Sequence, residues 1–175
     1  YMQQNDLLLP YKTIMENVTL PLILSGTSKS DAEKEAKKLF ETFLISGTEN
    51  KYPHELSGGM RQRAAFLRTY MQKKKILLLD EPFSALDNIT KTAMYSWFLN
   101  ITKSLKFTNL LITHDVEEAI LLANVVYIMS LTHHNITKSI NIAGKKNLDF
   151  SFSPEFANLK KEIMLTLREI LLHKI

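Results

Sequence analysis

The sequence predicts an α/β domain with a mainly parallel sheet, because helical and apolar strand-like segments alternate along the chain. Two of these strands end in polar residues: Ile76–Leu79 runs into Asp80-Glu81-Pro82, and Thr108–Thr113 runs into His114-Asp115. Four aliphatic residues in a row favour a strand that is buried on both faces of the sheet. Ligands bind at the carboxyl ends of strands in such sheets, so a site is expected there, although Leu-Leu-Leu-Asp alone is also common in plain buried strands.

Composition limits the classes of function. The 175 residues fit one domain, and 45% hydrophobic and 23% charged residues are ordinary for a globular protein. The net charge of +4 comes from scattered clusters rather than one basic surface, so no nucleic-acid partner is expected. The absence of cysteine excludes disulfides and thiolate metal sites. No apolar run approaches the roughly 20 residues of a membrane helix, so any membrane association is expected to be peripheral.

The first part of the chain is expected to be an exposed loop followed by helices. Pro10 disfavours a helix through Leu9, so Tyr1–Asn17 is predicted to be a loop that leads into a short helix. Ser30 and Glu33 match a capping box for a second helix, which Gly47 is expected to end. The apolar residues of that helix recur at helical spacing: Ala32, Ala36, Leu39, Phe40 and Phe43.

A glycine-rich segment precedes the next helix, which is predicted from about Met60 to Gln72. Gly58 and Gly59 allow the backbone to approach a ligand closely, and the free amides at a helix start bind anions. Ser57 is equally suited to be a plain N-cap, which is the commoner role of Ser-Gly-Gly in isolation.

The remaining elements follow from hydrophobic periodicity and capping residues. Ile89–Lys106 is predicted to be a helix whose apolar face belongs to the core. Ser153 and Pro154 are expected to begin the last helix. Between them we expect a helix at Val116–Ala123, strands at Val125–Ser130 and Ile136–Ile142, and a turn at Thr132–Asn135.

These motifs, in this order and spacing, resemble the ATP-binding cassette (ABC) ATPases, the motor subunits of ABC transporters. The resemblance is specific in Leu56-Ser57-Gly58-Gly59-Met60-Arg61-Gln62-Arg63 and in Glu81-Pro82-Phe83-Ser84-Ala85-Leu86-Asp87. Leu7-Leu8-Leu9-Pro10, His114–Ala119 and Ser153–Phe156 are similar to the nitrate, sulfonate and taurine importer group. The resemblance to the ABC ATPases implies a P-loop NTPase-like domain, with helices on both faces of the sheet and a helical subdomain.

The resemblance also implies how the chain is organised. We expect one partial nucleotide-binding domain over residues 1–175, with a Q-loop segment at 1–18 and a helical subdomain with the signature motif at 19–72. The core from the Walker B strand to the switch histidine is expected at 73–143, and the C-terminal helix at 144–175.

By the same resemblance, several residues surround Mg²⁺ and ATP. Asp80 is expected to hold Mg²⁺, Glu81 to polarise the attacking water, and His114 to contact the γ-phosphate. Gln4, the Q-loop glutamine, is expected to approach both Mg²⁺ and the water. Across a dimer, the signature residues are expected to contact the ATP of the other subunit, and the loop of Asp87 to contact the opposite site; these cofactor-binding residues are Ser57, Gly58, Gly59, Gln62 and Asp87.

The chain departs from the family pattern most clearly in lacking a Gly-x-x-x-x-Gly-Lys-Ser/Thr loop. Gly144-Lys145-Lys146 is not such a loop, because it lacks the preceding glycine. There are two further departures. Asn124-Val125 replaces the usual Asp-Arg after the helix that follows His114, and lysines replace the usual Asp-Pro before the Ile76 strand. In this family the loop precedes the Q-loop glutamine. We therefore expect it upstream of Tyr1, which we do not expect to be the natural start.

The resemblance predicts an ATPase subunit at the cytoplasmic face of the membrane. Its expected partners are a second ATP-binding subunit, which makes a homodimer, membrane permease subunits and, indirectly, a solute-binding protein. The expected solute is a small anion such as nitrate, sulfonate or taurine. Two alternatives stay open: a non-catalytic module that donates its signature motif to a competent partner, and an ABC ATPase of DNA repair or translation.

The chain of residues 1–175 alone is predicted neither to bind ATP tightly nor to hydrolyse it. Four or five charge-assisted hydrogen bonds from the missing loop, at about 1.5–3 kcal/mol each, amount to roughly 6–15 kcal/mol. Micromolar binding corresponds to only about 8 kcal/mol. Titration calorimetry with Mg-ATP measures this affinity, and a micromolar dissociation constant would contradict the prediction.

Overall fold

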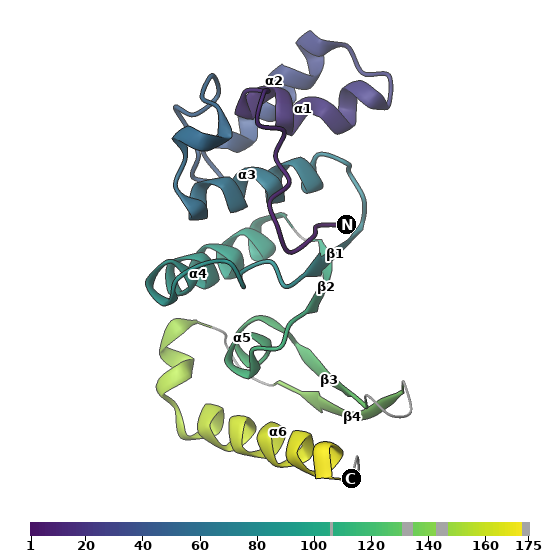
Figure 1. Ribbon diagram of the computed structural model, residues 1–175, viewed down its shortest axis with the longest axis vertical. Coiled ribbons are helices and arrows are strands. Elements are labelled where there is room, and N and C mark those ends of the chain that lie inside the picture. The colour runs from purple at the N-terminus through teal and green to yellow at the C-terminus, as the bar shows by residue number, and fades with distance from the viewer. Residues whose placement is uncertain (106, 131–134, 143–146, 173–175) are drawn as a thin grey trace. The chain divides into compact units, whose positions relative to one another are not determined.

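The computed structural model describes residues 1–105, 107–130, 135–142 and 147–172 (Figure 1). By its internal contacts the chain divides into two compact units. The first unit comprises Tyr1–Met94 and Asn100–Ile112, and the second comprises Tyr95–Leu99 and Thr113–Ile175. Both units contain helices and strands, as expected for the predicted α/β class, but strict alternation does not hold, since three helices precede β1 and strand β4 follows strand β3 directly.

Three helices form the main core of the first unit: α1 (Ile14–Leu24), α2 (Lys29–Phe40) and α3 (Gly58–Tyr70). Helix α1 packs on both α2 and α3 (Figure 1). A short 3₁₀ helix, η1 (Pro53–Glu55), precedes α3. Large side chains that are fully buried fill this core: Ile14, Phe40, Phe43, Ile45, Phe66, Leu67 and Met71.

Helix α1 is longer than the short helix expected from the sequence. Its N-terminus has a capping box that the sequence analysis missed: Thr13 Oγ1 accepts a bond from the Glu16 N–H, and Glu16 accepts one from the Thr13 N–H. The helix continues through Pro21 and is followed by Gly26, whose φ of +94° is readily adopted only by glycine.

The predicted capping box of the second helix is wrong. Ser28, not Ser30, is the N-cap of α2, since its hydroxyl accepts a 3.2 Å bond from the Asp31 N–H and its backbone is extended. Ser30 lies inside the first turn. The helix also ends before Gly47, at Phe40, and a turn then directs Phe43 and Ile45 into the core. A serine at either position satisfies the sequence pattern, so only the backbone conformation distinguishes them.

Strand β1 (Ile76–Asp80) pairs in parallel with β2 (Thr108–Ile112), which confirms the predicted parallel pairing. The expectation that β1 is buried on both faces is wrong. Leu77 and Leu79 are buried, whereas Ile76 and Leu78 are 58% and 43% exposed. Side chains alternate between the two faces of a strand, and within the described residues only one face of this pair is covered.

Helix α4 (Asn88–Leu105) follows β1, and its residues Tyr95–Leu99 are assigned to the second unit. The apolar face predicted for it belongs to the core. Four of its five residues are buried and Leu105 is half-buried; the buried ones are Met94, Trp97, Phe98 and Ile101.

The second unit contains α5 (Val116–Leu122), β3 (Val125–Met129), β4 (Ile136–Asn141), η2 (Leu148–Phe152) and α6 (Pro154–Leu172) (Figure 1). Strands β3 and β4 are antiparallel, which the sequence did not predict. Of the turn predicted between them, residues 132–134 lie outside the described residues. Ser153 begins α6 as predicted, because its hydroxyl accepts a bond from the Phe156 N–H. Lys138 and Lys160 form ion pairs with Glu162 and Glu117.

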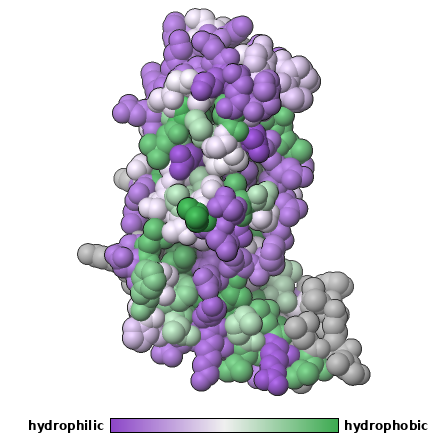
Figure 2. All heavy atoms as spheres, turned by 60° about the vertical axis from the view of Figure 1, so that its left-hand side comes forward, coloured by the Kyte–Doolittle hydropathy of each residue, from purple (hydrophilic) through white to green (hydrophobic). Residues whose placement is uncertain are grey.

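The surface around α2 is hydrophilic (Figure 2). At the top of the view, where Figure 1 places α1 and α2, most spheres are purple. Exposed α2 side chains of both signs, such as Asp31, Lys34, Lys37 and Lys38, account for this. None of the helices in the part of the chain that the structure describes is long and apolar enough to cross a membrane.

Asn17 joins the loop before α1 to the helix itself. Its side chain is completely buried. Its Oδ1 accepts a 2.7 Å bond from the Leu9 N–H, and its Nδ2 donates to the carbonyl oxygens of Leu9, Lys12 and Thr13 at 3.0–3.1 Å. The amide is thus a partner for the Leu9 N–H and the Lys12 carbonyl, whereas the Leu9 and Thr13 carbonyls also accept from the backbone N–H groups of Lys12 and Asn17.

Replacing Asn17 by alanine is expected to lower the free energy of unfolding by about 2–4 kcal/mol, because the Leu9 N–H and the Lys12 carbonyl lose their partner and a buried side chain is truncated. Chemical denaturation followed by circular dichroism measures the change. Asn50→Ala is the control, since Asn50 is exposed and its loss should change stability by less than about 0.5 kcal/mol. Equal effects of the two substitutions would contradict the role given to Asn17.

Candidate active site

The chain before α1 pairs with β1 and thereby places Gln4. The Met2 N–H donates to Leu78 O at 2.8 Å, and Met2 O accepts from the Asp80 N–H at 3.0 Å. Two residues further on, Gln4 Nε2 donates a 3.1 Å hydrogen bond to Glu81 Oε2. The structure therefore brings together two of the predicted catalytic residues, which are 77 positions apart in the sequence.

Glu81 has an unusual backbone conformation. Its φ of +44° lies in the left-handed region, which costs a residue with a side chain on the order of 1–3 kcal/mol. The neighbouring strand and turn hold it there: the Glu81 N–H donates to Ile112 O at 2.8 Å, and Ser84 Oγ donates to Glu81 O at 2.9 Å. Such strain is concentrated at functional sites, so it supports a functional role for this position.

Asp80 lies half-buried at the end of β1, as predicted. The Tyr1 hydroxyl donates a 2.6 Å bond to Asp80 Oδ2, and this bond to a carboxylate raises the pKa of Tyr1. Together, Asp80, Glu81 and Gln4 offer Mg²⁺ two carboxylates and one amide oxygen. Mg²⁺ usually binds one or two carboxylates and completes its shell with water and phosphate, so the donor set fits this ion. Among the described residues, no group of three or more acidic, histidine or cysteine side chains could hold a metal by itself.

The signature segment begins α3. Ser57 is exposed and is the N-cap, with its hydroxyl accepting from the Met60 N–H at 3.4 Å. Gly59 is buried, and a Cβ there would lie 3.1 Å from Thr90 Cγ2, closer than ordinary packing allows. A Cβ at Gly58 would make an ordinary contact, 3.4 Å from Leu86 Cδ2. Packing thus gives Gly59 a structural role in addition to the predicted contact with ATP.

Gln62 also has a structural role. It is buried, and its Nε2 donates to Pro82 O, next to Glu81. The second turn of the signature helix is therefore bonded to the turn that follows Glu81. The binding role of Gln62 stays a prediction.

Asp87 caps the start of α4. Its carboxylate accepts bonds from the N–H groups of Ile89 and Thr90 at 3.1 and 3.0 Å and from Thr90 Oγ1 at 2.6 Å. These bonds, with the Thr90 hydroxyl first, lower the pKa of Asp87. Its predicted contact across a dimer is untested by a single chain.

His114 is exposed and lies between β2 and α5. It belongs to the second unit, whereas Gln4, Asp80 and Glu81 belong to the first. Next to it, Asp115 is the N-cap of α5 and accepts from the N–H groups of Glu117 and Glu118. The contact of His114 with a γ-phosphate stays a prediction.

Two arginines of α3 contact the segment after Gln4, a role that the sequence motifs did not predict. Arg61 Nε bonds Asp6 Oδ2 at 3.1 Å, and Arg68 donates to the carbonyl oxygens of Asp6 and Leu7 at 2.6 Å. The two arginines are seven residues apart, which is about two helical turns, so they lie on the same face of the helix. This spacing is the one signal in the sequence that could have indicated a shared role.

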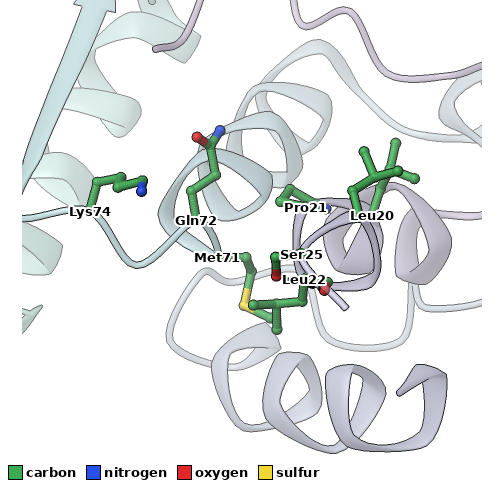
Figure 3. Close-up of a pocket in the computed structure, with 8 residues that line it drawn as sticks. Leu20, Pro21, Leu22, Ser25, Met71, Gln72 and Lys74 are labelled. Atoms are coloured by element: carbon green, nitrogen blue, oxygen red, sulfur yellow. Dashed lines mark hydrogen bonds between the residues drawn. The ribbon is translucent and has the colours of Figure 1, made fainter. Parts of the chain in front are cut away.

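The first unit also has a shallow hollow of about 390 Å³ (Figure 3). It lies between the C-terminal end of α1 and the residues after α3, and its lining is mainly apolar, with Leu20, Pro21, Leu22 and Met71. None of its lining residues is among the predicted site residues.

The chain is similar in sequence and fold to known proteins of one family. The family described as "ABC transporter" matches residues 1–84. The Formylaminopyrimidine import ATP-binding protein ThiZ of Halalkalibacterium halodurans is 52% identical over 130 residues, which are 74% of this chain and 52% of that protein. The uncharacterized ABC transporter ATP-binding protein YtlC of Bacillus subtilis is 38% identical over 174 residues, 97% of this chain and 67% of that protein.

The Nitrate import ATP-binding protein NrtD of Synechocystis sp. is 38% identical over 173 residues, 94% of this chain and 65% of its own length. A solved structure, the dimeric ATP-binding cassette MJ0796 in a post-hydrolysis state bound to ADP and Pi, superposes with a TM-score of 0.64 at 26% identity. The match covers 81% of this chain and 62% of that one.

The chain belongs to the family of ABC transporter ATP-binding proteins. Its relatives include importers, so the family expected from the motifs is confirmed. The chain spans about half to two thirds of the length of these relatives.

Proposed function

We propose that the intact protein is the ATP-hydrolysing subunit of an ABC importer. The contact between Gln4 and Glu81 at the end of β1 is the main support, because it joins the amide proposed to position water to the carboxylate proposed to polarise it. Phosphoryl transfer needs mainly positioning and charge stabilisation, and these two side chains with Asp80 provide groups for both.

Each side chain has a separate task in this proposal. Asp80 and Gln4 help to hold Mg²⁺, which neutralises charge on the phosphates when it is bound. Glu81 accepts a hydrogen bond from the attacking water and polarises it, and Gln4 fixes the orientation of the Glu81 carboxylate. His114 contacts the γ-phosphate. The 175 residues do not contain the phosphate-binding loop of the family pattern.

A second copy is needed to complete each site. Ser57, Gly58 and Gly59 lie at the start of α3, where backbone N–H groups and the helix dipole favour an anion. In the proposed head-to-tail dimer they bind the γ-phosphate of ATP on the partner copy, and the loop of Asp87 contacts the opposite site. The dimeric state of the similar MJ0796 cassette supports this assembly. We further propose that the dimer binds permease subunits at the cytoplasmic face of the membrane.

The solute is proposed from the relatives, because a separate binding protein and permease select it. The 52% identity with ThiZ favours formylaminopyrimidine, and the 38% identity with NrtD favours nitrate. We favour the pyrimidine over the small anion expected from the sequence, since the higher identity is to the pyrimidine importer.

Glu81→Gln in the intact protein is expected to lower steady-state ATP hydrolysis by at least about 100-fold, because an amide cannot accept a proton from water. Binding of ATP should persist, since the amide retains the size of the carboxylate and the Gln4 contact can still form. Phosphate release measures turnover, and size-exclusion chromatography with ATP detects the trapped dimer.

Glu41→Gln is the control for this substitution, since Glu41 is exposed and has no proposed role in the site. It should retain wild-type turnover. Unaltered turnover in Glu81→Gln would refute the role proposed for Glu81, and absence of turnover in the wild-type protein would refute the ATPase function.

Deleting the gene of the intact protein is expected to abolish uptake of labelled formylaminopyrimidine and to leave nitrate uptake unchanged. Restoring the wild-type gene should restore uptake, whereas the Glu81→Gln gene should not. Loss of nitrate uptake alone would show that the small-anion assignment is the correct one.

A further inference from the structure

The segment after Gln4 is held by groups from two different helices. On one side, buried Asn17 of α1 bonds both the N–H and the carbonyl of Leu9. On the other side, Arg61 and Arg68 of α3 bond Asp6 and Leu7. Because Met2 is already bonded to β1, Gln4 lies between two fixed points only a few residues apart.

The backbone of the segment after Gln4 is strained at Leu7. Leu7 has a φ of +46°, in the left-handed region that a leucine rarely adopts, and its side chain is half exposed. Asp6 Oδ1 accepts a 3.1 Å bond from the Leu8 N–H and closes a tight turn around this residue. A strained turn persists only where the surroundings determine it, and the carbonyls of Asp6 and Leu7 are the atoms that Arg68 bonds.

Arg68 is suited to this task by its geometry. The planar guanidinium presents several N–H donors in a fixed arrangement, so one side chain can bond two successive carbonyl oxygens. Burial lowers the pKa of Arg68, and the Asp6 carboxylate opposes that shift. Arg61 adds an ion pair to the same aspartate and also donates to Leu56 O at 2.8 Å, next to Ser57.

We propose that Arg61 and Arg68, which we name the arginine clamp, are positioning residues that hold Gln4 against Glu81. The clamp bonds the signature helix α3 to the turn that sets the direction of the Gln4 segment. The start of α3, proposed to bind the ATP of the partner copy, and the Gln4–Glu81 pair are then parts of one bonded unit. The expected loss of kcat rests on the proposed function, whereas the expected opening of the turn at Leu7 does not.

The kinetic test uses the intact protein with Arg68→Ala, Arg68→Lys and, as control, Arg168→Ala, since Arg168 is an exposed residue of α6. Misplacing a catalytic group by about 1 Å can cost on the order of 100-fold, so kcat should fall about 10- to 100-fold in Arg68→Ala. The KM for ATP should change by less than about twofold, because neither arginine is proposed to contact ATP or Mg²⁺. Lysine has no planar fork, so Arg68→Lys should not restore kcat.

A double-mutant cycle with Gln4→Ala decides whether the clamp acts through Gln4. If it does, Arg68→Ala should lower kcat further by less than about twofold in the Gln4→Ala background. Fully additive losses in the two backgrounds would overturn the proposal, as would wild-type kcat in Arg68→Ala.

Hydrogen exchange of the nucleotide-free intact protein tests the clamp without activity. The amides of Leu8 and Leu9, which bond Asp6 and Asn17, should exchange about tenfold faster in Arg68→Ala, because the turn opens locally. Arg168→Ala should leave them unchanged. If Arg68→Ala does not fold, Arg61→Ala and Arg68→Lys provide the same comparison. Unchanged exchange at Leu8 and Leu9 would overturn the clamp, whereas faster exchange in a protein without ATPase activity would overturn only the proposed function.

Discussion

The pairing of β1 on both of its edges is the constraint on which the rest of the site depends. Met2 bonds one edge of the strand and β2 the other, so the direction of the chain at Asp80 is fixed. The next residue, Glu81, is bonded through its N–H to the end of β2 and takes a strained conformation. Gln4 can reach its carboxylate because Met2, two residues earlier, belongs to the same sheet.

The signature helix has a wider structural role than its motif suggests. Its N-terminus offers a helix cap with exposed Ser57, while Gln62, Arg61 and Arg68 bond the turn after Glu81 and the segment after Gln4. Glycine at position 59 lets α3 lie close to Thr90 of α4. One helix therefore carries residues with a predicted role in binding ATP and residues that bond or pack against neighbouring segments, and Gly59 and Gln62 belong to both groups.

Motifs with a strong local cause were predicted well. The strands that end at Asp80 and near His114 and the last helix after Ser153 are all present, as is the helix predicted from about Met60, which begins two residues earlier at Gly58. The Ser30 cap and the two-sided burial of β1 were wrong because both depend on what surrounds the segment. Several serines lie near the start of α2, and apolar strands look alike whether one or both faces are covered.

The sequence by itself determined the family and the identity of the candidate catalytic residues, because spacing and residue type are local properties of the chain. Only the tertiary structure decided which of these side chains meet. Folding brings together three sets of hydrogen-bonded residues that the sequence does not pair. They are Gln4 with Glu81, Arg61 and Arg68 with Asp6 and Leu7, and Asn17 with the backbone groups of its four bonds. Backbone carbonyls are the acceptors in many of these bonds, and every residue has one, so no pattern of side chains could have identified them.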